Sequence, residues 1–217
     1  MKFLSAKFFL VLVLVTAPII YLKIVYDMLP EKIAVHFGAD MQPDRFGDKS
    51  ELWNIILILM GVSFLLYILM VNLGKIDPKN QSMQSKDLIE KIGLSVVTFL
   101  SLISIYIIYN SFNPTNGNFI FILLGGFFAF LGNFMYNVKP NYFVGIRLPW
   151  TLENEENWRK THHLGGKIWV IGGLLIVLTG ILLSPALMYK ILLPILLVIV
   201  LIPVIFSYRY YEKSKNK

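Results

Sequence analysis

Apolar and polar positions along this chain fall into long blocks. Six apolar windows occupy residues 6–26, 52–73, 88–110, 118–137, 164–183 and 187–208, and polar segments separate them. A helix needs about 20 apolar residues to cross roughly 30 Å of hydrocarbon. The pattern therefore predicts an all-α, polytopic membrane protein with six transmembrane helices.

Composition supports this class and excludes others. Hydrophobic residues make up 56% of the 217 residues and charged residues only 15%, which is too apolar for a soluble domain of this length. Lys2 and Lys7 give the chain a basic start just before and within the first window, as in a cleaved leader. The window's apolar run continues past Pro18 to Val25, however, which is longer than a typical leader core, so we expect it to remain as a span. The absence of cysteine excludes thiol catalysis and disulfides.

Charge predicts the orientation of the spans. Fifteen of the 20 Lys and Arg residues fall on the side that holds both termini and segment 138–166. The positive-inside rule places that side in the cytoplasm. The net charge of +7 is spread over membrane margins that face anionic lipid, so we expect lipid as a partner and no nucleic acid. A multi-pass protein of the cell membrane is predicted.

Segment 27–51, between the first two windows, is too patterned to be a plain helical connection. Ile33, Val35 and Phe37 alternate with smaller or polar residues, which predicts a short strand. Residues 42–47 contain the Pro, Asp and Gly typical of a turn. A structured extracellular loop is therefore predicted after the first span.

His36, Asp44 and Arg45 are the candidate binding residues of this loop. Together with Asp40, the first two have the donor types of a divalent metal site, but no two of them have the tight spacing of a metal signature. In the alternative interpretation, Asp44 pairs with Arg45 or Lys49, and His36 packs beside its neighbour. No metal is predicted.

Segment 138–166, between the fourth and fifth windows, is polar and dense in Trp, Arg, Glu and His. Acidic residues begin the run 152–163 and basic residues end it, which is the charge order that favours a helix. Pro149 separates this run from the fourth window, and Gly165 and Gly166 permit a bend into the fifth. We therefore predict an interfacial cytoplasmic helix over 152–163.

Three residues of this segment suit the inner membrane surface. Trp150 and Trp158 have side chains that prefer the headgroup level. Arg147 has the planar fork that binds a phosphate or a Glu. We expect these side chains to set the depth of the interfacial helix.

Catalytic chemistry is not indicated by any motif. The chain has no HExxH, no nucleophile elbow and no Gly-rich phosphate loop, and the adjacent His162 and His163 would point about 100° apart on a helix. We predict no enzyme and no cofactor. One alternative is a membrane-embedded enzyme acting on lipid or envelope precursors, with His162 and a Glu as acid and base. Another is a membrane signalling scaffold that binds a cytosolic protein through Trp158.

Glycines recur in the fifth window. Gly166, Gly173 and Gly180 are seven residues apart and form a stripe of small residues on one helix face. Such stripes let helix backbones approach closely in lipid. We expect this span to be central to the bundle.

The motifs of both polar segments resemble those of the SdpI family, bacterial multispanning immunity proteins. In the inner segment the matching residues are Asn141, Gly145, Arg147, Pro149, Trp150, Thr151, Trp158, Thr161, His162 and Gly165. The outer loop is similar to a membrane domain of unknown function common in the amino-terminal half of the same proteins, through Leu29, Pro30, Ile33, His36, Phe37, Pro43, Asp44, Gly47 and Lys49.

This resemblance implies a function. It implies an integral membrane immunity protein that protects the producing cell from a secreted antimicrobial peptide toxin and that also signals to a cytoplasmic regulatory protein. It further implies an amino-terminal membrane part, 1–110, and an SdpI-like part, 111–217. The signature residues from Asn141 to His162 and the three loop residues named above are the candidate contacts for toxin or partner.

Overall fold

The computed structural model describes residues 6–39, 42–76, 86–112 and 117–215. Within these residues, six helices are long and apolar enough to cross a membrane. They are α1 (Ala6–Val25), α2 (Glu51–Ile76), α3 (Lys86–Asn110), α4 (Asn118–Met135), α6 (Glu155–Leu182) and α7 (Pro185–Lys215). The predicted all-α, six-span membrane fold is confirmed.

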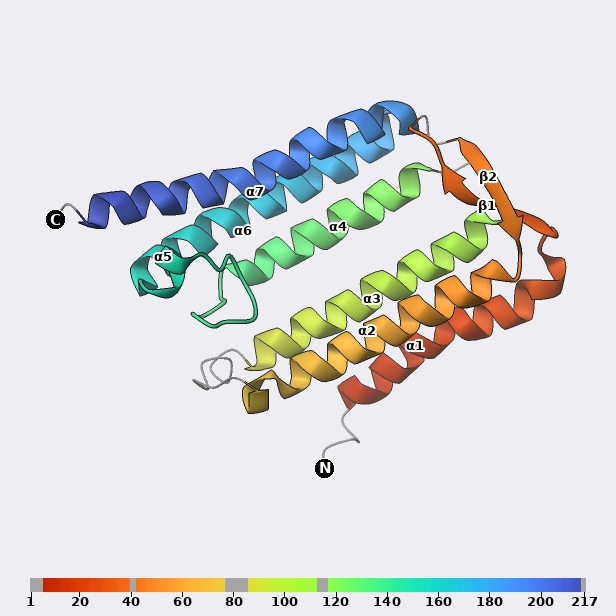
Figure 1. Cartoon of the computed structure of the whole chain (residues 1–217), viewed down its shortest axis with the longest axis horizontal. Coiled ribbons are helices and arrows are strands. Elements are labelled where there is room, and N and C mark those ends of the chain that lie inside the picture. The colour runs from red at the N-terminus through yellow and green to blue at the C-terminus, as the bar shows by residue number, and fades with distance from the viewer. Residues whose placement is uncertain (1–5, 40–41, 77–85, 113–116, 216–217) are drawn as a thin grey trace.

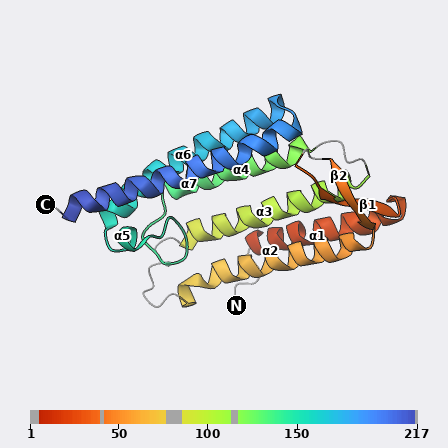
Figure 2. The ribbon, with the colours of Figure 1, turned by 45° about the horizontal axis from the view of Figure 1, so that its top comes forward.

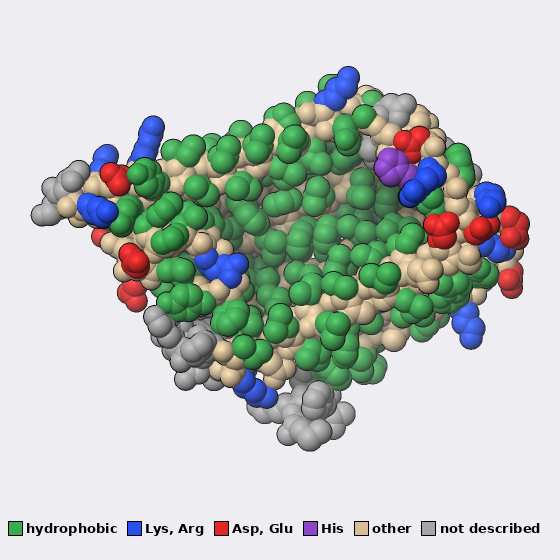
Figure 3. Space-filling view, viewed as in Figure 1, with side chains coloured by type: hydrophobic (Ala, Val, Ile, Leu, Met, Phe, Trp, Pro, Cys, Tyr) green, Lys and Arg blue, Asp and Glu red, His purple; other side chains and the backbone are tan. Residues whose placement is uncertain are grey.

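The long helices lie side by side in two groups (Figures 1 and 2). α1, α2 and α3 pack together, α4, α6 and α7 pack together, and α3 contacts α4 between the groups. Hydrophobic side chains cover the flanks and charged side chains gather at the two ends (Figure 3). Large apolar side chains on the flanks are exposed, such as Phe9 at 69% and Leu182 at 70%. Such a surface suits lipid as the surrounding solvent.

A β-hairpin covers one end of the bundle, which we call the hairpin end (Figure 1). After a short 3₁₀ turn (Tyr26–Met28), strand β1 (Lys32–Phe37) pairs antiparallel with β2 (Pro43–Asp48). The predicted strand is therefore confirmed. The predicted turn over 42–47 is wrong, because residues 43–47 belong to β2, whose backbone hydrogen-bonds that of β1. Ile33 is 2% exposed and joins a core cluster with Leu22 and Ile56, which anchors the hairpin to α1 and α2.

The opposite end of the bundle, the termini end, holds the first residues of α1, the last of α7 and the loop between α4 and α6 (Figure 1). A separate helix does lie between the fourth and fifth long helices, but it is the short α5 (Pro149–Leu152). Residues 155–163 are helical as predicted, but they form the first turns of α6, so the predicted separate helix over 152–163 is wrong. α6 begins at Glu155, where Asn154 caps it by accepting a hydrogen bond from the Asn157 backbone N–H, and it continues to Leu182.

The predicted bend at Gly165 and Gly166 does not form, because both glycines are used for packing. A Cβ on Gly166 would lie 2.8 Å from the Gly132 carbonyl oxygen of α4. A Cβ on Gly165 would lie 2.9 Å from the Ile146 side chain. The helix therefore continues without a break through the glycines, and the basic residues predicted to end a helix lie within α6 instead.

Close approach of α4 and α6 confirms the predicted packing role of the glycine stripe. A Cβ on Gly132 would lie 2.7 Å from the Val170 backbone nitrogen, and a Cβ on Gly125 would lie 2.6 Å from the Gly173 carbonyl oxygen. Real Cβ atoms do not approach backbone atoms so closely. The absence of side chains at these positions is thus what allows the two backbones to touch.

Replacing Gly132 by Ala should force the two helices apart. We expect Gly132→Ala to destabilise the protein by about 1–3 kcal/mol, as overpacking does, and to lower the midpoint of thermal unfolding measured in detergent. Gly126→Ala is the matched control, because Gly126 lies in the same helix with nothing within 4 Å of its Cβ position. Equal unfolding midpoints for the two variants would contradict the packing role.

Candidate functional site

At the termini end, Asn141 organises the loop that connects α4 to α5. Its side chain is fully buried, and its oxygen accepts hydrogen bonds from the backbone N–H groups of Phe143 and Val144, both at 2.8 Å. Its amide nitrogen donates to the carbonyls of Lys139 and Val144 at 2.9 and 3.1 Å. One short side chain therefore satisfies four backbone groups, which closes the loop on itself.

The loop packs onto the first turns of α6 through Gly145 and Ile146. The Ile146 backbone N–H donates to His162 Nε2 at 2.9 Å. Gly145 has a φ of 119°, and a Cβ there would collide with the His162 ring and approach the Trp158 ring to 3.1 Å. Glycine is required at this position both for its backbone conformation and for the space.

Trp158 and His162 form the buried centre of this site, at 1% exposure each. Their rings stack with centroids 4.0 Å apart, and the Trp158 indole N–H donates to the Val138 carbonyl at 2.7 Å. His162 Nδ1 lies 2.8 Å from the Trp158 carbonyl oxygen. Since Nε2 accepts from Ile146, Nδ1 must be the donor, so the imidazole is neutral with both nitrogens engaged.

Thr151 fixes the turn that begins α5. The Leu148 backbone is extended and its N–H donates to the Thr151 hydroxyl at 2.9 Å, while that hydroxyl lies 2.9 Å from the Ile146 carbonyl. Pro149 occupies the first helical position, where its missing N–H breaks no helical bond. Arg147 projects outward, is exposed, and donates to the Tyr142 carbonyl at 2.6 Å.

The site reaches α7 through Trp150 and Asn157. The Trp150 indole N–H donates to the Ser207 hydroxyl at 2.9 Å, and its ring packs edge-on against Tyr208. The Asn157 amide donates to the Ser207 carbonyl at 3.1 Å and accepts from the buried Thr161 hydroxyl at 3.0 Å. The motif residues thus hold α4, α5, α6 and α7 together at one end.

One expectation for this site is wrong. Trp158 was expected to lie at the headgroups but is fully buried, because its indole fills the space beneath the loop. It therefore offers no surface to a cytosolic protein. The expectation that Arg147 binds a phosphate or a Glu stays a prediction; its exposed guanidinium donates to the Tyr142 carbonyl of its own loop. Sequence reasoning also missed Asn157 and Ser207; a polar residue with aromatic neighbours at the end of an apolar helix was the available signal for Ser207.

At the hairpin end, His36 and Asp44 face each other across the two strands. His36 Nδ1 lies 2.6 Å from the Asp44 carboxylate, and both side chains are more than half exposed. Asp44 was expected to pair with Arg45 or Lys49 and pairs with His36 instead, because the strand pairing sets the two residues on one face. Among the residues that the structure describes, no three metal-ligating side chains gather, and Asp40 lies outside them.

Ion pairs line the same hairpin. Lys32 bonds Asp48 at 2.8 Å, and Lys49 bonds Glu31 at 2.9 Å while lying over the Tyr26 ring. The hydrogen bond to Asp48 raises the pKa of the Lys32 ammonium, and the bond to Glu31 raises that of Lys49. Both lysines therefore stay charged at neutral pH, and the hairpin presents alternating charges.

The fold and these two ends define a class: a six-span membrane protein with a β-hairpin at one end and a buried Trp–His polar site at the other. Residues 137–210 match the SdpI/YfhL protein family, and residues 13–60 match a domain of unknown function (DUF1648). The chain is 25% identical over 192 residues to "Immunity protein SdpI" of Bacillus subtilis (strain 168), which is 88% of each chain. These matches confirm the resemblance to the SdpI family. No solved structure matches the chain.

Replacing His162 should weaken the fold rather than remove an activity. In His162→Phe the ring stack on Trp158 is kept but the Ile146 N–H loses its buried acceptor, so we expect a loss of about 1–3 kcal/mol of stability. Thermal unfolding in detergent, followed by tryptophan fluorescence, measures it. His163→Phe is the control, because that ring stacks on Tyr136 and the change preserves the stack. Unchanged unfolding of His162→Phe would refute the anchoring role.

Proposed function

We propose that this chain is a membrane immunity protein, which protects the cell that makes it from a secreted antimicrobial peptide toxin. The observation that carries the proposal is the 25% identity to an immunity protein over 88% of both chains. The structure supports it, because the residues of the family signature converge on one buried site instead of scattering over the bundle.

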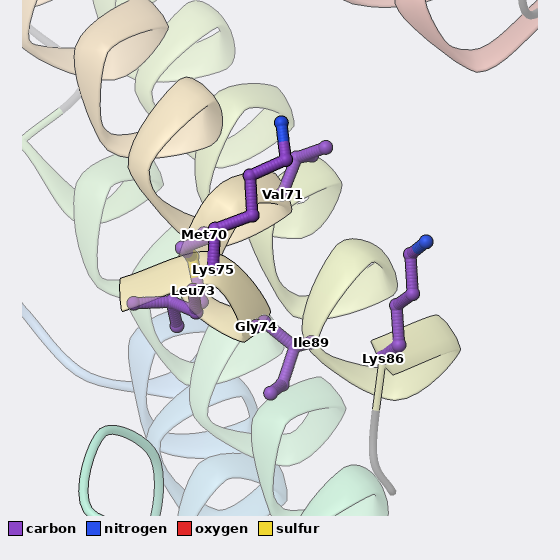
Figure 4. A pocket seen from close by; sticks show the side chains of 7 residues that line it. All are labelled: Met70, Val71, Leu73, Gly74, Lys75, Lys86 and Ile89. Atoms are coloured by element: carbon purple, nitrogen blue, oxygen red, sulfur yellow. The ribbon is translucent and has the colours of Figure 1, made fainter. Parts of the chain in front are cut away.

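We propose that the termini end faces the cytoplasm and the hairpin end faces outward. The basic residues support this orientation. At the termini end, Lys75 and Lys86 flank a small pocket of about 160 Å³ between the ends of α2 and α3 (Figure 4). Lys2, Lys79 and Lys217, which belong to the same charge asymmetry, lie outside the described residues.

In this proposal the toxin meets the hairpin. The hairpin combines exposed polar and charged groups, His36, Asp44 and Arg45, with Phe46, which is 59% exposed. An amphipathic peptide arriving at the membrane presents the same mixture of apolar and charged groups. Exposed polar pairs contribute little to stability, so we propose that the hydrogen-bonded His36 and Asp44 serve recognition.

The buried site at the termini end then positions α6 and α7, and it is not a centre of catalysis. His162 has no free nitrogen to act as acid or base, since both nitrogens are bonded within the protein.

A second proposed role is recruitment of a cytoplasmic regulatory protein. The exposed Arg147 and Tyr142, which is 39% exposed, are the observation that favours it.

Cysteine labelling tests the proposed orientation. The natural chain has no cysteine, so single-cysteine variants carry one label site each. We expect Phe46→Cys to react with a membrane-impermeant maleimide in intact cells, and Ser214→Cys to react only after permeabilisation. Labelling of Ser214→Cys in intact cells would contradict the proposed orientation and indicate the opposite one.

Survival of toxin-sensitive cells that express this chain tests immunity. We expect the wild type to protect against an Sdp-type peptide toxin and Asp44→Asn to protect at least several-fold less at equal membrane level. Asp48→Asn is the matched control, since it breaks the other exposed pair of the hairpin, Lys32 with Asp48. No protection by the wild type would refute immunity, and equal protection by both variants would refute the role of Asp44.

Arg147→Ala should keep protection and lose any co-purifying cytosolic protein.

A further inference from the structure

A groove of about 510 Å³ runs between α3 and α4, the helices through which the two groups contact each other. Its lining extends from Lys91 to Leu102 on α3 and from Phe134 to Ile122 on α4. Gly126 of α4 also lines it and has nothing within 4 Å of its Cβ position. Among the residues that the structure describes, no helix therefore packs on α4 at this point, and the groove opens toward the surrounding lipid.

The walls of the groove suit an apolar occupant. Phe99 of α3 and Phe127 of α4 both line it, and their rings stack with centroids 4.1 Å apart. Ser95 and Thr98 bring hydroxyl groups to the wall, but each donates to a backbone carbonyl of its own helix, at 2.7 and 2.9 Å. With these donors already used, an occupant meets mainly hydrocarbon along the groove.

Lys91 adds a positive charge at the end of the groove that lies toward the termini end. It is exposed and forms no ion pair with a described residue, although Asp87 lies one turn earlier in α3. Lys91 lies about 7.5 Å along α3 from its first residue, so the ammonium can reach the headgroup level on its flexible stem. An unpaired ammonium at the end of an apolar groove complements an anionic headgroup that is joined to a hydrocarbon chain.

The length of the groove matches one leaflet of a bilayer. From Lys91 to Leu102, α3 rises about 16 Å at roughly 1.5 Å per residue. One leaflet contributes about half of the roughly 30 Å of hydrocarbon, so an acyl chain whose headgroup lies at Lys91 ends near Leu102. A second copy of the chain suits the groove less well. Copies in one membrane have the same orientation, so a two-fold contact through the groove would bring two Lys91 ammonium groups to the same depth, where they repel.

We propose that this groove binds one anionic phospholipid of the leaflet at the termini end. The lipid phosphate binds the Lys91 ammonium, and one acyl chain lies along Phe99 and Phe127 toward Leu102. The bound lipid contacts both groups of helices. It stabilises the protein by mass action, as does any ligand that binds only the folded state. The proposal does not depend on the immunity function.

Lipid retention by the full-length protein tests the proposal. The protein is purified in a non-ionic detergent, mixed with phosphatidylglycerol or with phosphatidylcholine of the same acyl chains, and weighed by native mass spectrometry. We expect the wild type to retain phosphatidylglycerol about fivefold better than phosphatidylcholine, and Lys91→Gln to lose this preference with the charge. Lys167→Gln is the matched control and should keep the preference, because Lys167 is exposed in the half of α6 nearer the termini end but lies outside the groove.

A second variant and a second readout separate lost binding from lost folding. Gly126→Leu places a side chain in the groove and should retain both lipids less than the wild type does. Phosphatidylglycerol should raise the unfolding temperature of the wild type and Lys167→Gln but not that of Lys91→Gln, while without lipid these three proteins should unfold alike.

Three results would overturn the proposal. They are equal retention of the two lipids by the wild type, an undiminished preference in Lys91→Gln, and wild-type retention of phosphatidylglycerol by Gly126→Leu. A wild-type dimer that Gly126→Leu breaks would also overturn it, because the groove would then be an interface between copies.

Discussion

The contact between α4 and α6 is the constraint on which the rest of the carboxy-terminal half depends. In lipid there is little hydrophobic force to bring two helices together, so close packing of their backbones must do it. Gly125 and Gly132 on α4 meet Gly173 and Gly166 on α6, and this contact brings the end of α4 beside the first turns of α6. Because the end of α4 lies beside these turns, the loop that connects α4 to α5 can fold back over Trp158.

The two ends of the bundle differ in how their buried polar groups are hydrogen-bonded. At the termini end, buried polar groups bond one another: Asn141 closes the loop, His162 receives the Ile146 N–H, and Asn157 reaches α7. A site so fully bonded holds helices in place and has little to offer a ligand. At the hairpin end, Asn110 remains unpaired beside a cavity.

The packing of the helices divides the chain into two groups. α1, α2 and α3 form one group with the hairpin, while α4, α6 and α7 form the other, and the contact between α3 and α4 connects them. The division into parts 1–110 and 111–217 stays a prediction, as do the roles of the individual site residues.

The sequence by itself determined the six spans, the strand at 32–37, the glycine contact and the family resemblance, because apolar length, period and small-residue spacing are local properties of the chain. Tertiary structure alone decided the rest. The run 152–163 has the charges of a separate helix, yet its residues from 155 onward continue into α6, because Gly166 packs against α4 where a bend was expected. Trp158 has the character of a headgroup anchor, yet the loop closed by Asn141 buries it. Each outcome depends on a surface contributed by a distant segment, and no local pattern contains that surface.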